Sequence, residues 1–308
     1  MPKPKSKSTS TSKSTALEYT LTNDVLFKML FRDYPELLKH LVAELLKIPF
    51  DSIGSFTVKN PEMPPDSMLE KFCRLDIVME VDGRLVDLEV QVGKEKNFRD
   101  RALFNWARLF SSGLPSGDDY SELPPSIVIS ILAFPLFKCA EFHSEYSALE
   151  VNRHERLTDK MGLHFFELPK LPKVTDGNDK LQLWLALFKA KTEQELKHLI
   201  TIGGTIMAQA VEAYHHVSAS GEFKELERLR DRARRDEASA LAYARREGAR
   251  KADEKWEGVV AEKDKTYAAV LAKKDAILAE RNAALAERDR AVAAAEAELK
   301  ALRAQLGL

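Results

Sequence analysis

Residues 74–91 read RLDIVMEVDGRLVDLEVQ, and this short stretch decides how the middle of the chain folds. The dipeptide Asp82-Gly83, set between two largely apolar runs, is a strong signal for a β-hairpin with a two-residue turn. Such a turn places Val81 opposite Arg84, and this pair fixes the register of both strands. Alternate residues then form an apolar face. We therefore predict an antiparallel hairpin whose apolar face packs on the core.

The other face of the predicted hairpin carries acids. The same register puts Asp76 directly opposite Glu89, and Arg74 opposite Gln91. Directly opposed residues have Cβ atoms roughly 4.5–5.5 Å apart, so two carboxylates there repel unless one is protonated or a cation lies between them. Mg²⁺, or another hard divalent cation such as Mn²⁺, prefers oxygen ligands of this kind. The pattern therefore predicts a metal site on the hairpin.

A second interpretation of these acids stays open. Acids are common on the solvated face of an amphipathic hairpin, and we expect Glu80 and Asp87 to be of that ordinary kind. One extra residue bulged into either strand would also separate Asp76 from Glu89. Motifs elsewhere in the chain are needed to choose between the two interpretations.

Composition divides the 308 residues into a tail, a globular region and a helical segment. Residues 1–15 carry four lysines and no acid among many Ser and Thr residues, which predicts a disordered tail. Residues 222–308 are rich in Ala, Glu, Lys and Arg and predict one or two long helices. The chain has a formal net charge of −1, the tail +4 and the last segment +2, so residues 16–221 carry −7. A nucleic-acid-binding protein with that charge needs locally gathered basic residues or a bound metal ion.

The sequence excludes several classes of protein. The basic N-terminal residues lack the apolar segment of a secretory signal, and the longest apolar run, residues 127–137, is too short to span a membrane. Cys73 and Cys139 lack metal-ligand spacing and are expected to be reduced core thiols. The seven histidines form no zinc pattern, and His215-His216 is expected to lie on the surface. We therefore expect a cytoplasmic protein without a membrane partner.

The order of the expected elements indicates an α/β or α+β core. Apolar residues recur at helical spacing after Thr22 and Asn23, either of which can cap a helix, and again after Pro35, which suits a helix start. Strands and helices then mix around a sheet that contains the antiparallel hairpin. The other expected elements are a strand within 55–60, a helix within 97–114, a strand at 126–134 buried on both faces, a strand within 162–171, and helices at 179–191 and 193–217.

Seven short motifs follow one another through this region. They are D-x-x-F-K at Asp24–Lys28, R-L-D at Arg74–Asp76, E-x-Q at Glu89–Gln91, F-x-x-R-A at Phe98–Ala102, G-x-x-Y at Gly117–Tyr120, I-x-I-L-x-F at Ile129–Phe134 and E-L-P-K at Glu167–Lys170. Each motif alone is weak, but their order and spacing together are specific. Over residues 20–172 the chain resembles the recombination-promoting nuclease (Rpn) and putative transposase family, within the PD-(D/E)xK nuclease superfamily.

This resemblance implies a restriction-endonuclease-like fold, in which a four-stranded mixed sheet is flanked by helices and the active site lies on the central hairpin. It implies that Asp76 and Glu89 are catalytic metal ligands and that Gln91 takes the place where the wider superfamily has lysine. Mg²⁺ at such a site can neutralise a phosphate and activate water, whereas glutamine can orient water but adds no charge. Asp24 is a further candidate metal ligand, although an acid also suits the start of a helix.

Three basic residues are candidates for contact with the phosphates of DNA: Lys28, Arg74 and Arg101. Each could instead be an ordinary surface or ion-paired residue. Arg74, opposite Gln91, could supply the positive charge that the missing lysine would have brought.

The last segment has a heptad pattern. A spacing of seven separates Leu271, Leu278, Leu285, Val292, Leu299 and Leu306, which predicts a left-handed coiled coil and a homodimer. The second position of the seam is weak, so a single long helix is the alternative. The predicted organisation is a tail at 1–15, a nuclease-like domain at 16–175, a helical extension at 176–221 and a long helix or coiled coil at 222–308.

Two functions from different classes follow from these features. The first is a metal-dependent DNA endonuclease that hydrolyses phosphodiester bonds and serves recombination or a mobile element. The second is a nuclease-derived scaffold without catalytic activity, which oligomerises or binds partners through its C-terminal helix. The presence of both Asp76 and Glu89 favours the enzyme, whereas the acidic domain and the missing lysine favour the scaffold.

Overall fold

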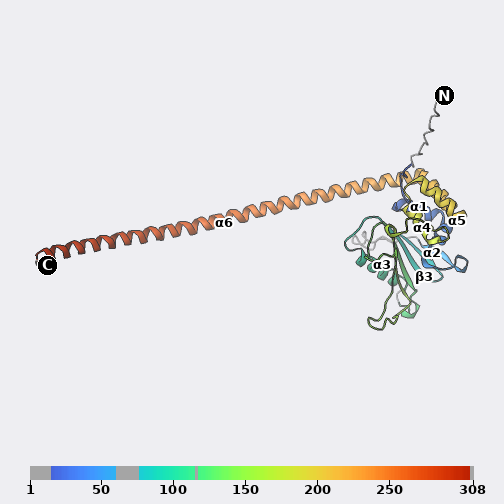
Figure 1. Ribbon diagram of the computed structural model, residues 1–308, viewed down its shortest axis with the longest axis horizontal. Helices are drawn as coiled ribbons and strands as arrows, with labels where there is room; N and C mark the ends of the chain where they lie inside the picture. The colour runs from blue at the N-terminus through green and yellow to red at the C-terminus, as the bar shows by residue number, and fades with distance from the viewer. Residues whose placement is uncertain (1–14, 60–75, 115–116, 306–308) are drawn as a thin grey trace, which may run out of the picture. The chain divides into compact units, whose positions relative to one another are not determined.

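The computed structural model describes residues 15–59, 76–114 and 117–305 (Figure 1). Most of the predicted N-terminal tail, and also Arg74, Leu75 and Cys73, lie outside the described residues. The chain divides into two compact units, Met1–Leu229 and Arg230–Leu308, and each is described by itself.

The first unit is built on one mixed sheet of six strands with the order β1-β2-β3-β4-β6-β5. The strands are β1 (Phe56–Lys59), β2 (Ile77–Val81), β3 (Arg84–Gln91), β4 (Ser126–Leu132), β5 (His143–Tyr146) and β6 (Met161–Glu167). β3, β4 and β6 run parallel to one another, whereas β1, β2 and β5 pair antiparallel with their neighbours. The mixed sheet confirms the predicted fold class, although it holds two strands more than the four that the resemblance implies.

The hairpin has the register that its turn predicts. Val81 pairs with Arg84 and Ile77 with Leu88. Asp82 and Gly83 have φ angles of 48° and 74°, and two positive φ values in a two-residue loop match the twist of the flanking strands. The described ladder ends at the pair of Ile77 and Leu88, so Asp76 is the residue immediately before β2. At this end of the strand its side chain contacts the amide of Val90 and the ammonium of Lys28.

The helices begin where the local sequence signals predict. The side chain of Asn23 accepts a hydrogen bond from the backbone amide of Leu26, and Pro35 occupies the first turn of its helix. Thr192 and Glu195 form a reciprocal capping box. The helices are α1 (Asp24–Asp33), α2 (Pro35–Leu46), α3 (Phe98–Ser112), α4 (Lys180–Lys189), α5 (Glu193–Ala219) and α6 (Gly221–Gln305).

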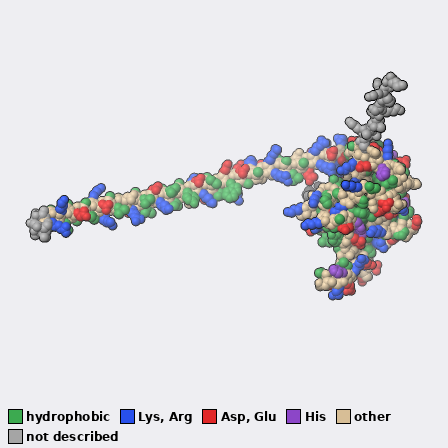
Figure 2. Space-filling model, viewed as in Figure 1, with side chains coloured by type: hydrophobic (Ala, Val, Ile, Leu, Met, Phe, Trp, Pro, Cys, Tyr) green, Lys and Arg blue, Asp and Glu red, His purple; other side chains and the backbone are tan. Residues whose placement is uncertain are grey.

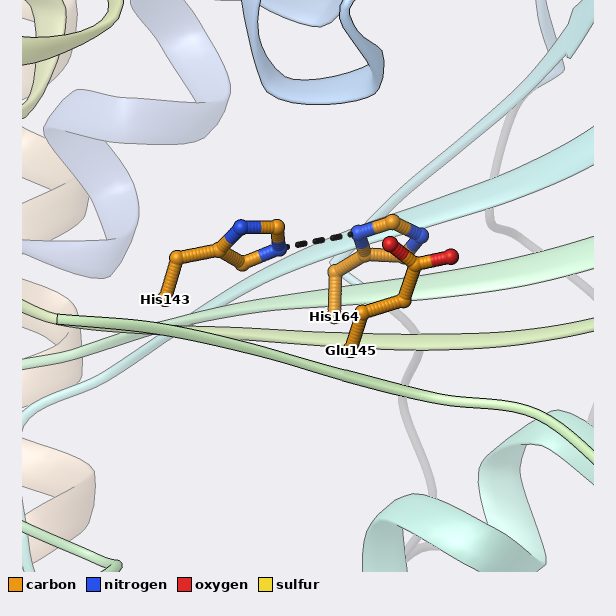
Figure 3. Close-up of side chains that lie close together, drawn as sticks. All are labelled: His143, Glu145 and His164. Carbon is orange, nitrogen blue, oxygen red and sulfur yellow. Dashed lines mark hydrogen bonds between the residues drawn. The ribbon is translucent and has the colours of Figure 1, made fainter. Parts of the chain in front are cut away.

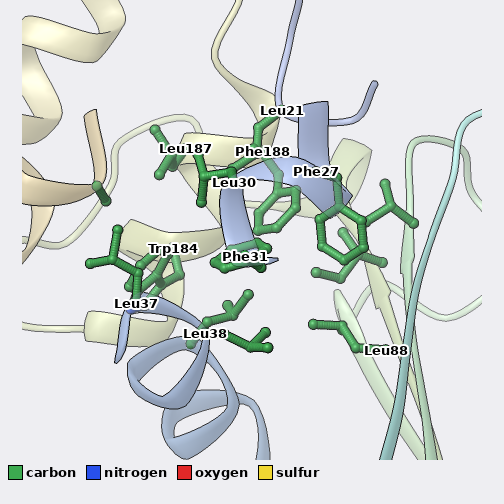
Figure 4. Packing of buried hydrophobic residues seen from close by; sticks show 14 of the residues in the cluster. Leu21, Phe27, Leu30, Phe31, Leu37, Leu38, Leu88, Trp184, Leu187 and Phe188 are labelled. Atoms are coloured by element: carbon green, nitrogen blue, oxygen red, sulfur yellow. The ribbon is translucent and has the colours of Figure 1, made fainter. Parts of the chain in front are cut away.

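Helices cover both faces of the sheet. α1, α2, α4 and α5 form a group on one face, and α3 lies on the other (Figure 1). The larger core is on the first face, where aromatic side chains of α1 and α4 pack above Leu88 of β3 (Figure 4). A smaller core under α3 joins Phe98 and Leu109 to Val128 and Phe165 of the sheet. Two buried faces explain why β4 is apolar along nearly its whole length.

One expectation about these segments is wrong, and one strand was not predicted. Cys139 is exposed, not a core thiol, because it lies in the irregular segment between β4 and β5 and not in an element that packs. The strand β5 was not expected, because its four residues, His143–Tyr146, are mostly polar and lack the apolar signal of a strand.

The second unit consists of residues of α6. None of its described side chains is buried, and charged and hydrophobic side chains are interspersed along it (Figure 2). The described leucines of the heptad pattern are among the exposed residues, with Leu278 53% exposed. Among the described residues, no helix has the length and apolar character needed to cross a membrane.

Candidate active site on the central hairpin

Asp76 is held from two sides at the end of the hairpin. Its Oδ2 accepts a hydrogen bond of 3.1 Å from the backbone amide of Val90 in β3. Its Oδ1 lies 3.0 Å from the ammonium Nζ of Lys28 in α1. The same ammonium lies 2.9 Å from Oδ1 of Asp24. Lys28 therefore bridges the two acids, and Asp24 contacts Asp76 through it.

Glu89 lies on the adjacent strand and is nearly inaccessible to solvent. Its Oε1 accepts a hydrogen bond of 2.8 Å from the hydroxyl of Ser130, which is its partner on β4. Its Oε2 lies 3.9 Å from a guanidinium nitrogen of Arg101 in α3. The parallel pairing of β3 with β4 and the packing of α3 thus fix this carboxylate from two elements.

The amide of Gln91 makes three hydrogen bonds at the end of β3, and its Oε1 keeps a second lone pair for a further donor. Its Oε1 accepts a 2.7 Å hydrogen bond from Arg101, and its Nε2 donates to the carbonyl of Gly93 and to Glu95. Arg101 also forms two short hydrogen bonds with the carboxylate of Glu95. Arg101 therefore joins Gln91 and Glu89 in one network and brings positive charge close to both.

Asp87 is buried, and the expectation that it lies on a solvated face is wrong. Its side chain is 0% exposed because it points to the face that α3 covers, beside its apolar pairing partners Val78 and Val128. Neither carboxylate oxygen has a hydrogen-bond partner among the described residues. Glu80 does lie near the surface, where it forms an ion pair of 2.7 Å with Lys59. The hairpin therefore carries a third buried acid close to Asp76 and Glu89.

Burial shifts the pKa of all three acids upward. For Asp76 the main cause is desolvation, and the nearby Lys28 opposes the rise in pKa. The pKa of Glu89 is raised by burial, against the hydrogen bond from Ser130 and the charge of Arg101. The pKa of Asp87 lies well above its usual value because of burial and then because of the charges of Glu89 and Asp76. The amide of Asp76 lowers this pKa slightly, although it does not meet the geometry of a hydrogen bond. The acids therefore destabilise one another's ionised form.

The donor set fits a hard divalent cation. It offers carboxylate oxygens alone, and among the described residues the two oxygens of Asp87 have no hydrogen-bond partner. A cation would relieve the repulsion that adds to burial in raising the three pKa values. The ligand atoms of the three acids do not all lie within 4.8 Å of one another. Among the described residues, one other group of side chains does meet this distance. Lys28 and Arg101 occupy positions against the outer oxygens of Asp76 and Glu89.

The structure thus brings together most of the residues that the sequence predicts for the site: Asp24, Lys28, Asp76, Glu89, Gln91 and Arg101. Arg74 lies outside the described residues. Sequence reasoning missed Ser130 and Asp87. Each is a polar residue between apolar neighbours, and period-two alternation assigns both to the same face of the sheet as Glu89. This alternation is the sequence signal that could have identified them.

A mixed sheet with helices on both faces and acids gathered on its central hairpin is the arrangement of a PD-(D/E)XK nuclease-like protein. Residues 21–244 match the family described as PD-(D/E)XK nuclease family transposase. This match covers more than half of the chain, so the chain belongs to that family. No match was found among curated proteins, and none was found among solved structures. Family membership supports a nuclease-like function, and nucleases of this superfamily generally use divalent metal ions.

Proposed function

We propose that the protein is a metal-dependent endonuclease that hydrolyses phosphodiester bonds of DNA. The observation that carries this proposal is the gathering of three acids on the hairpin: the partly buried Asp76 just before β2, and the buried Glu89 and Asp87 of β3. Among the described residues, neither carboxylate oxygen of Asp87 has a hydrogen-bond partner. An apolar core gains nothing from such a cluster, since buried unpaired acids destabilise a fold. DNA as substrate, and a role in recombination or in a mobile element, are proposed from the family description.

Asp76 and Glu89 would hold the divalent ion, Mg²⁺ or a similar cation such as Mn²⁺, and Asp24 is the further candidate ligand. When bound, the ion supplies charge neutralisation at the phosphate and lowers the pKa of a water molecule. The chain fixes both carboxylates beforehand: the amide of Val90 orients Asp76 and the hydroxyl of Ser130 orients Glu89. Little reorganisation is then needed when the substrate binds.

Gln91 and Arg101 act together where the wider superfamily has a lysine. The amide of Gln91 can orient a water molecule by hydrogen bonds, and Arg101 supplies the positive charge that the amide lacks. Lys28 adds a second positive charge beside Asp76. Its pKa is raised: burial lowers it, but the charges of Asp76 and Asp24 outweigh that effect, so Lys28 stays protonated. Both cations are proposed to contact the phosphate of DNA, and Arg74, which lies outside the described residues, is a further candidate from the sequence.

Nicking of supercoiled plasmid tests this function. Purified full-length protein is incubated with plasmid in Mg²⁺, Mn²⁺, Ca²⁺ or EDTA, beside the double variant Asp76→Ala/Glu89→Ala. We expect nicking in Mg²⁺ or Mn²⁺, none in EDTA, and none by the double variant. A matched control is Glu80→Gln, which changes an acid on the same hairpin that lies near the surface. If the folded wild type fails to nick with every metal, the endonuclease proposal is wrong.

The exposed heptad residues of α6 favour a second function, that of a scaffold that oligomerises through this helix. Leu271, Leu278 and Leu285 recur at a spacing of seven and are between 43% and 57% exposed in the single chain. A hydrophobic stripe of this period is typical of a helix that pairs with a second copy. We infer that residues 222–308 form a homodimeric coiled coil, which follows in the chain after the nuclease-like domain of 16–175 and its helical extension of 176–221.

Sedimentation equilibrium tests the inferred dimer. We expect twice the monomer mass for the wild type and the monomer mass for Leu278→Lys/Leu285→Lys, because buried lysines at the seam would repel each other. Glu280→Lys, a change of charge on the same helix outside the heptad leucines, is the matched control. A monomeric wild type at micromolar concentration would contradict the inference. If nicking is absent and the dimer is present, the scaffold is the better interpretation.

A further inference from the structure

Three potential metal ligands meet at the opposite edge of the sheet from β1. Glu145 of β5 is paired with His164 of β6, and His143 lies two residues before Glu145, so all three project to one face. Their ligand atoms lie within 4.8 Å of one another, and a hydrogen bond of 3.2 Å joins Nε2 of His143 to Nδ1 of His164 (Figure 3). Among the described residues, this is the one group of three or more such side chains that comes so close.

This cluster is separate from the candidate active site. His164 pairs with Ile129 of β4, whereas Glu89 pairs with the next residue, Ser130. Successive residues of a strand point to opposite faces, so the histidines lie on the face that α1 and α2 cover and Glu89 on the face that α3 covers. The cluster therefore lies on the opposite face of the sheet from Glu89.

We propose that His143, Glu145 and His164 form a second metal site, which binds a divalent transition-metal ion such as Zn²⁺. Zn–N bonds are about 2.0–2.1 Å long, so two ligands of a tetrahedral ion lie about 3.4 Å apart. The two imidazole nitrogens are already 3.2 Å apart. Imidazole nitrogen with one carboxylate oxygen suits Zn²⁺, Cu²⁺ or Ni²⁺, whereas Mg²⁺ prefers oxygen alone. The two metal sites would thus differ in the ion that they select.

The state of the histidines supports this assignment. Burial and the nearby charges of His164 and Lys47 lower the pKa of His143 to about 4, and burial also lowers the pKa of His164. Both rings are therefore neutral near pH 7 and have lone pairs to donate. One ring now donates its proton to the other, so it would bind the ion after moving this proton to its second nitrogen. Lys47 opposes a bound cation, and Glu145 favours it.

Ring packing is the competing explanation for the cluster. The ring of His143 stacks on Phe166 with centroids 4.3 Å apart, and on His164 at 5.4 Å. Stacking and one hydrogen bond could hold the two rings together without any ion. Ring packing accounts for the two histidines, whereas the metal site also uses the carboxylate of Glu145, which lies within 4.8 Å of both imidazoles.

Direct binding of Zn²⁺ and Co²⁺ distinguishes the two explanations. The protein used is the full chain carrying Asp76→Asn/Glu89→Gln, so that the candidate active site does not compete for metal. We expect isothermal titration to show one Zn²⁺ per chain and Co²⁺ to give visible absorption bands of a nitrogen-ligated ion. His143→Gln and Glu145→Gln should each weaken binding about 10-fold or more. His198→Gln, a change at an exposed histidine of α5, should leave binding unchanged.

Circular dichroism in EDTA shows whether each variant is folded. Because Glu145 is exposed at the sheet edge, Glu145→Gln is expected to fold and keeps the test valid if a histidine variant does not. The proposal is overturned if the parent binds no stoichiometric Zn²⁺, or if folded Glu145→Gln binds Zn²⁺ as tightly as the parent. Plasmid nicking by the otherwise wild-type chain is measured separately, so that failure of the nuclease proposal leaves this result intact.

Discussion

The two faces of β3 and β4 differ sharply, although the same two strands make both. On the face toward α1 and α4, Leu88 and Val86 of β3 lie beside Ile129 and Ile131 of β4, all buried and apolar. On the face toward α3, the register brings Glu89 beside Ser130. One face thus holds the larger hydrocarbon core, and the other places polar groups beside a smaller one, in a site of low solvent access.

This difference shows how alternation separates stability from chemistry within one element. A residue and its neighbour on β3 experience opposite environments, so each can change without directly altering the other's contacts. The apolar face supplies the free energy of folding, and that free energy supports buried acids that would otherwise be expelled. Substitutions on the two faces should therefore have separable effects.

The largest expected effect is on the acidic face. Glu89→Gln keeps the shape of the side chain and removes its charge, so we expect plasmid nicking to fall about 10³-fold. The melting temperature should stay the same or rise, because a buried carboxylate of raised pKa is lost. Nicking rates and thermal melts on the same preparation check this. If Glu89→Gln nicks plasmid as fast as the wild type does, Glu89 is not part of the proposed site.

The next effect is on the apolar face. Leu88→Ala deletes a fully buried side chain beneath α1 and should lower the free energy of unfolding by about 2–5 kcal/mol. Nicking per folded molecule at low temperature should change little, since Leu88 points away from the acids. Urea unfolding gives the stability. The control is Leu103→Ala on α3, which is 49% exposed and should cost less than about 0.5 kcal/mol. If Leu88→Ala strongly reduces nicking per folded molecule, the two faces are coupled.

A smaller and pH-dependent effect is expected at Asp87. Its raised pKa means that the folded chain holds a proton that the unfolded chain releases above about pH 4, so stability falls as pH rises toward the folded pKa. Asp87→Asn should therefore increase the free energy of unfolding by about 1–2 kcal/mol at pH 8 in EDTA, and by less at pH 5. Urea unfolding at both values measures this, with Glu80→Gln as the exposed control. An equal gain at pH 5 and pH 8 would rule out ionisation as the cause.

The smallest effect concerns the network at the end of β3. Arg101→Lys keeps the charge but loses the geometry that reaches Gln91 and Glu95 together. We expect nicking to fall about 5- to 10-fold, with most of the change in the maximal rate. Arg99→Lys, at a neighbouring position on α3 where the side chain bonds the carbonyl of Leu136, is the control. Equal losses in both variants would assign the effect to the packing of α3.

The sequence predicted the hairpin in detail because local rules control it. Asp82-Gly83 allows one tight turn, and period-two alternation then assigns every residue to a face. The starts of α1 and α2 followed in the same way from Asn23 and Pro35. The residues proposed for the site came from the same register, joined to a family resemblance.

What the sequence could not predict depends on which element covers which face. Alternation assigns Asp87 to the side of Glu89, but only the packing of α3 makes that side buried. His143 and His164 are far apart in the chain, and a short polar strand gives no signal that would bring them together. Sequence patterns report local structure and not contacts between distant segments. The burial of Asp87 and the meeting of His143 with His164 both depend on such contacts.

The polarity of β5 also bears on how the protein behaves at high concentration. An edge strand presents unpaired backbone groups that can recruit a strand from another molecule and start aggregation. β5 has four residues, and three of them, His143, Ser144 and Glu145, are polar. A strand so short and hydrophilic offers a poor template for a second chain. Replacing His143 and Glu145 with valine would give this edge the apolar, β-branched face on which fibrils grow.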